Sequence, residues 1–430
     1  MTSFFIHNFG CRVNQAEAFA WAEELQARGL RLNTECDGSD YVLVNSCTLT
    51  RHADRDVKRF VQKAARMNPG ARLVVTGCYA ERARGDFEGM PGVWMVVGNS
   101  GKKAVTAKIL ENAETIPLAP PIAGAIGGTA YRARAFVKIQ DGCDFRCAYC
   151  VIPSVRGKSV SVEEDEVVAR VRALVGRGYR EVVLAGIHLS FYGTDLEPRS
   201  SLPRLLGRIE CTERSARIRL SSLDPRSLDG AFVESLAANP MVAPHFHLSL
   251  QSGSERILRA MGRASAPRAN RETLERLRAV SPDAALGADI IVGFPGETEE
   301  DFEETREFIA GSPLTYVHVF PFSPREGTPA WGMNPVDEKT RARRASILRE
   351  LSRERDLRFR ERFIGRELNA VVIERNGRGG KGLTGNAIKV AVADCPVPRR
   401  ERMAVRIVGA SAEGTSGEAV RRDLGVSVGL

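Results

Sequence analysis

Residues 138–150 have the sequence KIQDGCDFRCAYC, and this short loop decides how the fold of the whole chain is interpreted. Its cysteines, Cys143, Cys147 and Cys150, follow the spacing C-x3-C-x2-C, which rarely arises by chance. Three thiolates on one loop can ligate three irons of a 4Fe-4S cluster. Because the loop offers no fourth ligand, one iron would stay open to bind a substrate or a cofactor. We therefore predict a 4Fe-4S cluster on these three cysteines.

Two other interpretations of the loop are weaker. A structural zinc site needs four ligands, usually from two knuckles, and the sequence holds no second C-x2-C pair and no H-x3-H pair. Three purely structural cysteines are the remaining alternative, which this close spacing disfavours.

The length and composition are those of a globular protein with two or three domains. The chain has 430 residues, of which 43% are hydrophobic and 27% are charged. No apolar run approaches the roughly 18 residues that a membrane span needs. The first residues, MTSFFIH, lack the basic and long apolar regions of a secretion signal. We therefore expect a cytoplasmic protein with no membrane partner.

Cysteine content and charge point to metal chemistry and to a polyanionic partner. Nine cysteines in a cytosolic chain favour metal or redox chemistry over disulfides. A net charge of +9, with an isoelectric point near 9.2, suits a polyanion such as RNA. Basic residues scattered over solvated surfaces would explain the same charge equally well.

The first region, residues 3–110, alternates short apolar strands with helical patterns, as parallel α/β domains do. Three predicted strands end just before a cysteine: 3–9 before Cys11, 41–45 before Cys47 and 73–76 before Cys78. The carboxyl ends of parallel strands lie on one edge of the sheet, so these thiols should converge. One such cysteine alone would more often be a small buried hydrophobic residue, but three in equivalent positions predict a second iron-sulfur cluster. The remaining cysteines are interpreted as structural: Cys36, Cys211 and Cys395.

The middle region repeats strand and helix from residue 135 to about 335 and follows a Pro- and Gly-rich linker. Repeated βα units imply a parallel sheet, either open or curled into a barrel, with function at its carboxyl edge. The predicted strand ends are rich in small and polar residues that can approach a ligand closely. They comprise residues 186–188, 221–225, 251–254, 293–298 and 322–325.

The last region combines a long basic helix with short β-type runs. Residues 337–363 predict one helix whose arginines, including Arg344, Arg353 and Arg360, are expected on a solvated face. Beyond Gly365 the pattern predicts a small β-barrel with basic loops, a frequent form of RNA-binding domain. The tail after Ser411 is expected to be mobile.

The chain resembles the methylthiotransferases of the radical S-adenosylmethionine (SAM) superfamily across nearly its whole length. The resemblance implies an N-terminal cluster domain (1–112), a linker (113–130), a radical SAM partial (β/α) barrel (131–364) and a C-terminal TRAM β-barrel with a tail (365–430). Six motifs carry it: GCRVN at 10–14, NSCT at 45–48, GCYA at 77–80, the 138–150 loop, HLSLQSG at 247–253 and GFPGET at 293–298.

The resemblance also implies cofactors and partners. In that superfamily SAM chelates the open iron of the loop cluster and is cleaved to a 5'-deoxyadenosyl radical. Tyr149 is expected to lie against the adenine of SAM, and small or polar residues would line the rest of the pocket. These lining residues are Gly186, Gln251, Gly293 and Gly296. A methylthio transfer would further require a tRNA anticodon stem-loop, a sulfur donor and a reductant such as flavodoxin or ferredoxin.

Within the family, the start GCRVN, the stretch GCYA and residues 221–223 are most similar to the branch that acts on threonylcarbamoyladenosine in tRNA. Branches acting on isopentenyladenosine or on a ribosomal protein are the alternatives. An RNA-binding or electron-carrying iron-sulfur protein of the same fold is a competing class. One departure concerns Val162, which stands where the family usually has an arginine.

Overall fold

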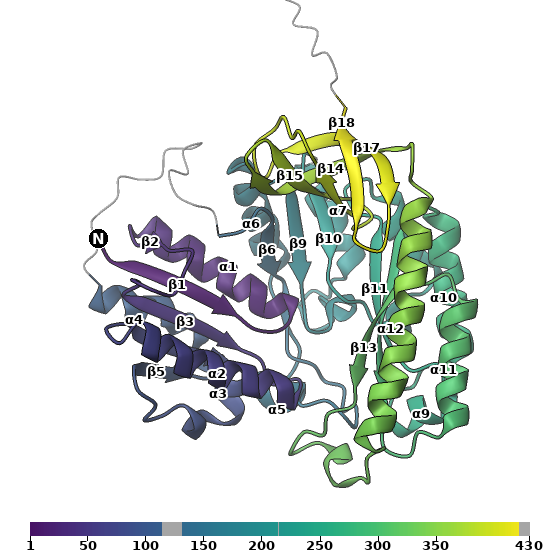
Figure 1. Ribbon diagram of the computed structural model, residues 1–430, viewed down its shortest axis with the longest axis horizontal. Coiled ribbons are helices and arrows are strands. Elements are labelled where there is room, and N and C mark those ends of the chain that lie inside the picture. Colours follow the sequence, from purple (N-terminus) through teal and green to yellow (C-terminus); the bar gives the residue numbers. More distant parts are fainter. Residues whose placement is uncertain (114–130, 214, 421–430) are drawn as a thin grey trace, which may run out of the picture.

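The computed structural model describes residues 1–113, 131–213 and 215–420. Three domains follow one another along the chain: an α/β domain, a half-open barrel and a small closed β-barrel (Figure 1). Most of the predicted linker, residues 114–130, lies outside the described residues. Within the described part of the chain, no helix is both long and apolar enough to cross a membrane.

The N-terminal domain is a five-stranded parallel sheet in the order β2-β1-β3-β4-β5. Its central strand β3 is buried at every position, because helices cover both faces. Its strands are β1 (Ser3–Asn8), β2 (Arg31–Leu32), β3 (Tyr41–Ser46), β4 (Arg72–Gly77) and β5 (Val93–Val97). Its helices are α1 (Arg12–Ala27), α2 (Arg51–Met67), α3 (Cys78–Arg82) and α4 (Val105–Asn112).

The middle domain is built on six parallel strands in the order β6-β9-β10-β11-β12-β13. The two three-stranded halves join at Leu223, whose N–H donates to the His247 carbonyl at 2.8 Å and whose carbonyl accepts from Ser249 at 2.9 Å. The strands are β6 (Ala135–Lys138), β9 (Glu181–Ala185), β10 (Arg217–Leu220), β11 (His245–Gln251), β12 (Ala285–Val292) and β13 (Tyr316–Pro321). The sheet therefore curls into a partial barrel. The strand and helix pattern of the sequence had not distinguished this form from an open sheet.

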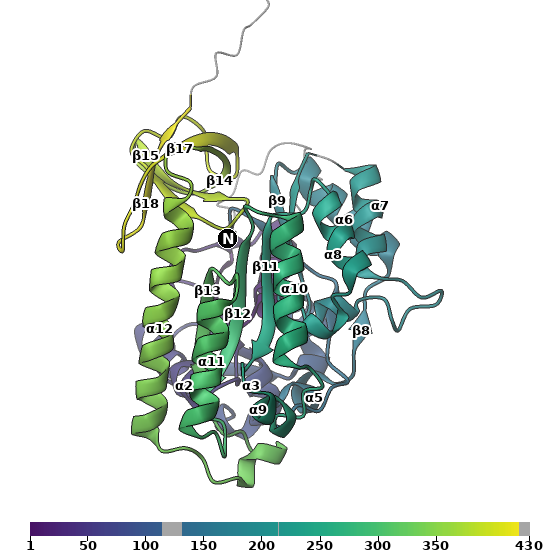
Figure 2. The same ribbon diagram turned by 90° about the vertical axis from the view of Figure 1, so that its right-hand side faces the viewer.

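Helices cover the outer face of this curled sheet (Figure 2). They are α6 (Glu164–Gly176), α7 (Leu202–Thr212), α8 (Gly230–Ala238), α10 (Pro267–Val280), α11 (Glu299–Gly311) and α12 (Glu338–Glu361). Two short helices, α5 (Ile152–Arg156) and α9 (Glu255–Ala260), and a two-stranded ribbon of β7 (Gln140–Asp141) and β8 (Val160–Ser161) surround the cysteine loop. The first helix of the chain, α1, packs against β6 and so joins the two domains.

The basic face predicted for α12 is only partly solvated. Arg353 is exposed, as predicted. Arg344 and Arg360, by contrast, are 3% and 9% exposed. Arg344 Nη1 lies 2.6 Å from the Glu297 carboxylate, and this ion pair holds α12 against the 293–298 turn. The prediction was wrong for these two arginines because each gains a partner from a distant segment.

The C-terminal domain is a closed barrel in the order β14-β15-β16-β18-β17. Its strands are β14 (Glu367–Asn376), β15 (Gly379–Thr384), β16 (Lys389–Val392), β17 (Arg402–Ala410) and β18 (Thr415–Ala419). The mobile tail predicted after Ser411 was therefore wrong for residues 415–419, which close the barrel, whereas 421–430 lie outside the described residues. The sequence TSGEA lacks apolar alternation because Gly417 fills an interior position, where a Cβ would lie 2.6 Å from Val405.

Candidate iron-sulfur and cofactor site

The N-terminal domain brings Cys11, Cys47 and Cys78 together at one edge of its sheet, as predicted from the sequence. Cys11 precedes α1, Cys47 follows β3, and Cys78 begins α3 directly after β4. Gly10 has φ +95°, and a Cβ there would lie 2.9 Å from the Cys47 sulfur. Only glycine lets the Cys11 turn approach this closely. We call these residues the strand triad.

The thiols of the strand triad lie close enough to interact electrostatically. Burial raises the pKa of Cys47 to about 12, with smaller contributions from negative charge on Cys11 and Cys78. The Cys78 sulfur accepts a hydrogen bond from Arg156 Nε at 3.2 Å. Thiols with raised pKa values ligate metals only if the metal displaces their protons. Three soft donors in such a pocket suit an iron-sulfur cluster.

The loop triad, Cys143, Cys147 and Cys150, is held by backbone contacts. Cys143 N–H donates to the Gly157 carbonyl at 3.1 Å, and Ala148 N–H donates to the Met261 carbonyl at 2.9 Å. Gly142 has φ +69°, and a Cβ there would overlap the Lys158 carbonyl oxygen.

Burial also raises the pKa of Cys143 and of Cys150. That of Cys150 reaches about 12, with the charges of Cys147 and Cys143 adding to the effect of burial. The loop therefore offers the same three soft donors as the strand triad.

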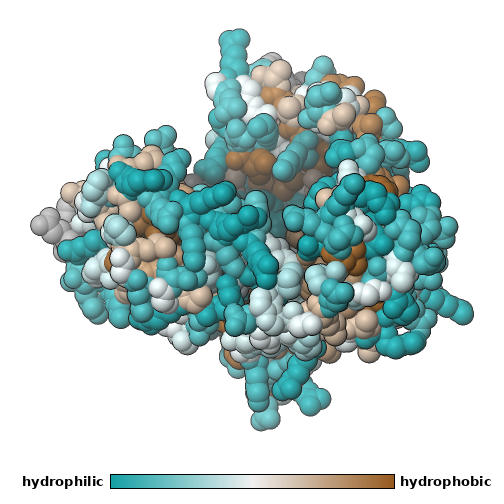
Figure 3. Space-filling view, turned by 60° about the horizontal axis from the view of Figure 1, so that its bottom comes forward, coloured by the Kyte–Doolittle hydropathy of each residue, from teal (hydrophilic) through white to brown (hydrophobic). Residues whose placement is uncertain are grey.

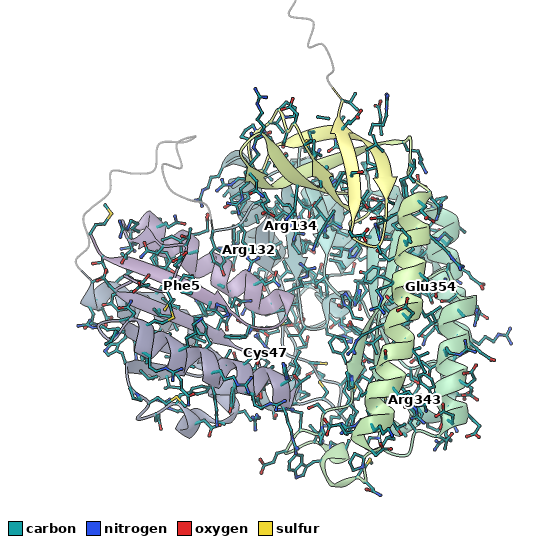
Figure 4. The ribbon with its side chains drawn as sticks, in the orientation of Figure 1. Phe5, Cys47, Arg132, Arg134, Arg343 and Glu354 are labelled. Atoms are coloured by element: carbon teal, nitrogen blue, oxygen red, sulfur yellow. The ribbon has the colours of Figure 1, made fainter. Side chains whose placement is uncertain are left out.

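The two triads meet across the domain interface. Cys78 packs in one buried cluster with Val151, Ile152 and Val155, the residues that follow the loop, and Cys143 and Cys150 lie against the same cluster. Cys47 lies at the end of the N-terminal sheet that faces the barrel (Figure 4). The surface is hollowed between the lobe of the N-terminal domain and the lobe of the barrel (Figure 3).

A buried charge network fixes the interface beside the triads. The Arg156 side chain is fully buried, and its Nη1 lies 2.8 Å from Asp141 and 3.1 Å from Glu17. Lys102 and Lys138 also contact Glu17.

Burial alone would raise the pKa of Glu17, but Lys102, Arg156 and Lys138 outweigh it and hold that pKa well below its usual range. This network could not be predicted from the sequence, because its members come from four separate segments.

The structure brings some of the predicted SAM-binding residues together. Tyr149 and Phe294, the residue after Gly293, lie in one apolar cluster with Met261. Gly186 N–H donates to Ser221 Oγ at 3.2 Å, and a Cβ there would crowd Gln140 and Leu189.

Two further residues that were predicted to line the SAM pocket have positive φ angles, Gln251 with +76° and Gly296 with +80°. Gln251, 9% exposed, has φ +76° at an irregularity in β11, a strained conformation typical of functional sites. Gly296 has open space where a Cβ would be.

Gly293 has a structural role that the sequence did not reveal. A Cβ there would overlap the Arg341 side chain on α12. Its N–H donates to Glu297 Oε2 at 2.6 Å. The packing of α12 alone therefore requires glycine at this position, whether or not a cofactor lies nearby.

The sequence did not identify Asp224 as a residue that pairs with three other side chains at the site. Its carboxylate lies 3.1 Å from His188 Nε2, 2.7 Å from Arg226 and 3.0 Å from Arg263. Burial would raise its pKa, but these partners hold it well below the usual range. Arg263 also pairs with the Tyr149 side chain, so these contacts reach the cysteine loop. The strand end 221–225 was the available signal, although its arginine partners were not predictable.

A second polar cluster lies inside the barrel on β11, β12 and β13. His247 Nε2 and His318 Nδ1 lie 2.9 Å and 3.4 Å from Asp289. The Tyr316 hydroxyl lies 2.8 Å from His245 and 3.0 Å from His247. Both ring nitrogens of His247 are thereby paired within the cluster.

The other predictions for single residues have mixed outcomes. Cys36 and Cys395 are buried, in keeping with a structural role, whereas Cys211 is exposed and packs in no core. Val162 is half-buried against the main hydrophobic core, and its carbonyl accepts from the Tyr192 hydroxyl at 2.7 Å.

Comparison with known proteins identifies the family to which this architecture belongs. A family model described as "Radical SAM superfamily" matches residues 137–309, and one described as "Uncharacterized protein family UPF0004" matches residues 3–98. Threonylcarbamoyladenosine tRNA methylthiotransferase MtaB of Rickettsia prowazekii is 35% identical, over 86% of this chain and 88% of the relative. The protein of that name from Thermotoga maritima is 36% identical over 84% of each chain.

The chain belongs to the methylthiotransferase family of radical SAM enzymes. The resemblance seen in the sequence is thereby confirmed, and the chain is a transferase. Another relative in the family, the tRNA-2-methylthio-N(6)-dimethylallyladenosine synthase of Thermobifida fusca, is 32% identical over 87% of this chain and 78% of its own.

The fold is also that of a solved structure, the radical SAM methyltransferase TsrM from Kitasatospora setae with cobalamin and a [4Fe-4S] cluster bound. The TM-score is 0.56 at 13% identity, over 77% of each chain. This likeness confirms the α/β fold class.

Proposed function

We propose that the chain transfers a methylthio group to C2 of N6-threonylcarbamoyladenosine next to the anticodon of tRNA. The observation that carries the proposal is the meeting of two cysteine triads at one domain interface, with Cys78 packed against the residues that follow Cys150. Replacing an aromatic hydrogen by a sulfur group needs a radical source and a sulfur source close together. Relatives that are named for this reaction match at up to 36% identity over most of the chain.

In this proposal each triad holds one 4Fe-4S cluster. Bound at these sites, the clusters and SAM supply the radical that activates C2 and the methylthio group that replaces its hydrogen. Tyr149, Gly186, Gln251, Gly293 and Gly296 form the SAM pocket at the carboxyl ends of the strands.

The protein's own residues provide position and exclude water. Asp224 orients Arg263, and through it Tyr149, beside the loop triad. Arg156 donates to the Cys78 sulfur and pairs with Glu17 on α1, so these buried contacts hold α5 against the N-terminal domain.

The C-terminal barrel, residues 365–420 of the proposed TRAM domain, would hold the anticodon stem-loop. Its exposed basic side chains can neutralise phosphates without reading the sequence. They include Arg375, Arg378, Lys381, Lys389 and Arg406. Arg217 Nη2 and Arg219 Nη2 each donate to a carbonyl of β15, at 2.9 Å, so the barrel is fixed to the central domain.

The proposed reaction defines further partners. Reductive cleavage of SAM needs an electron and the product contains a new sulfur atom, so we include a small reductant such as flavodoxin or ferredoxin and a sulfur donor. A tRNA substrate also places the enzyme in the cytoplasm.

Mass spectrometry of tRNA nucleosides from a deletion strain tests the proposal. We expect 2-methylthio-threonylcarbamoyladenosine to disappear and its precursor without sulfur to accumulate. Loss of the isopentenyladenosine derivative, or of a methylthio group on a ribosomal protein with tRNA unchanged, would contradict the assignment. Complementation by the intact gene, but not by a Cys147→Ala gene, is the matched control.

A further inference from the structure

A cavity of about 520 Å³ lies between α1, the amino ends of the barrel strands, α12 and the C-terminal barrel. Arg12 on α1, Arg134 before β6 and Arg219 on β10 line it. Figure 4 shows Arg134 where the N-terminal domain, the half-open barrel and the C-terminal barrel come together. None of the predicted SAM-binding residues lines this cavity.

The arginines around the cavity outnumber the acids that could neutralise them. Glu181, fully buried, accepts from Arg134 at 3.2 Å, from Arg217 at 2.7 Å and from Arg219 at 2.8 Å. Its two oxygens are thus already shared by three guanidinium groups. Arg12 forms no hydrogen bond or ion pair with any residue in the described ranges, and Glu181 and Tyr316 act on it only through longer-range electrostatics.

Two other acids line the cavity, and both are engaged elsewhere. Asp356 lies 2.8 Å from Arg360, and Glu413 accepts from the Ser411 hydroxyl at 2.5 Å. Asp289, in the neighbouring histidine cluster, faces His247 and His318. The cavity wall formed by Arg12, Arg134 and Arg219 therefore keeps an excess of positive charge.

A buried donor and a buried ring nitrogen, both without partners among the described residues, also belong to residues that line this cavity. Arg219 is 2% exposed, yet its Nη1 has no hydrogen-bond partner among the described residues. The same holds for Nδ1 of His245, which is 8% exposed and also lines the cavity. A buried donor left unpaired costs free energy, so the free Nη1 of Arg219 points to a ligand that accepts hydrogen bonds.

We propose that this cavity binds the carboxylate of the threonylcarbamoyl group, with Arg12 and Arg219 as its donors. This inference rests on the function proposed above and names the residues that select the substrate. Arg12 follows Cys11 directly, so the turn that presents one ligand of the strand triad also presents a cation to the cavity. The adenine would lie between the triads while its N6 substituent extends toward Arg12.

The positive charge of this cavity would discriminate between tRNA that carries threonylcarbamoyladenosine and tRNA that carries isopentenyladenosine. A threonylcarbamoyl group ends in a carboxylate, whereas an isopentenyl group is uncharged and has no hydrogen-bond acceptor. Guanidinium groups bind carboxylates through parallel charge-assisted hydrogen bonds. A site built for a charged group also rejects a ligand that lacks it, because the arginines would be desolvated without compensation.

The test compares Arg12→Gln with Arg12→Lys and with Arg31→Gln, a control at an exposed arginine on β2 of the same domain. Each reconstituted protein, without reductant, is titrated with anticodon stem-loops that carry threonylcarbamoyladenosine or an analogue in which an alcohol replaces the carboxylate. KM and kcat are then measured with reductant and SAM.

For the wild-type protein we expect the carboxylate to strengthen binding roughly 10- to 100-fold. Arg12→Gln should lose this preference and raise KM by the same factor, with its iron content unchanged. Arg12→Lys should keep part of the preference, and Arg31→Gln all of it.

Two outcomes would overturn the inference. One is that Arg12→Gln discriminates the two stem-loops as the wild type does. The other is that the wild type itself binds both equally while still methylthiolating threonylcarbamoyladenosine. If instead the wild type modifies only isopentenyladenosine, the proposed function fails first, and the two failures are thereby distinguished.

Discussion

The two cysteine triads have the same chemistry but are assembled in opposite ways. Cys143, Cys147 and Cys150 lie within one short loop, so their spacing alone predicts a cluster. Cys11, Cys47 and Cys78 stand at the ends of three separate strands and meet only because the sheet is parallel. The first triad depends on local backbone geometry, and the second on the packing of a whole domain. This difference determines which substitutions should damage each one.

The largest effect is expected from Cys147→Ala. The loop triad would lose one of three ligands, and SAM cleavage should fall below detection because no other described residue in the loop can replace a thiolate. The measurement is 5'-deoxyadenosine formed by the reduced, reconstituted enzyme. Cys211→Ala, at an exposed cysteine, is the control and should cleave SAM normally.

Alanine substitutions at two glycines should show that the triads are independent, because each substitution should damage only one triad. A Cβ on Gly77 would overlap the backbone of Ser46, and one on Gly142 would overlap that of Lys158. Each variant should lose roughly 3 kcal/mol or more in its own region. Gly77→Ala should keep SAM cleavage but bind about half the iron, whereas Gly142→Ala should lose cleavage.

Gly85→Ala is the control for this pair, because Gly85 has open space around its Cα. It should change neither iron content nor cleavage. If Gly77→Ala lost cleavage as fully as Gly142→Ala does, the triads would not be independent.

A smaller effect is expected from Arg156→Gln at the interface between the triads. Removing one partner of a buried ion pair costs about 3 kcal/mol, and here it leaves Asp141 and Glu17 with less compensation. The melting temperature should fall, and methylthiolation should fall more than SAM cleavage, because only the former needs both triads. Equal losses would contradict the positioning role of Arg156.

The same network predicts how stability depends on pH. Burial would raise the pKa of Asp141 and of Glu17, but Arg156 and the lysines lower both. A carboxylate with a depressed pKa in the folded state stabilises fully above its unfolded pKa of about 4 and loses this contribution as pH falls further. Between about pH 5 and pH 3 the melting temperature of the wild type should therefore fall more steeply than that of Arg156→Gln.

The smallest effect is expected from Thr298→Ala. Thr298 and Asp301 form a capping box at the start of α11, with Asp301 N–H donating to Thr298 Oγ1 at 3.3 Å. Loss of the cap should cost about 1 kcal/mol and leave the iron content of both triads unchanged. A raised KM for SAM would support the place of the 293–298 turn in the cofactor pocket, which remains a prediction.

The sequence predicted the parts of the site that are repeated or local, and missed those that depend on tertiary contacts. Strand ends followed by cysteines could be recognised because parallel topology fixes where such ends lie. Arg344 and Arg156 could not be placed, since their carboxylate partners lie in distant segments. β18 was missed because Thr415 and Gly417 carry no apolar alternation, although both lie in the barrel interior.

The central claim is that the two triads hold two clusters with different roles, and a triple Ala variant of Cys11, Cys47 and Cys78 tests it most directly. After anaerobic reconstitution the wild type should bind about eight irons and the variant about four. The variant should still form 5'-deoxyadenosine from SAM but should add no methylthio group to a threonylcarbamoyladenosine stem-loop. Eight irons in the variant, or methylthiolation without the strand triad, would contradict the claim.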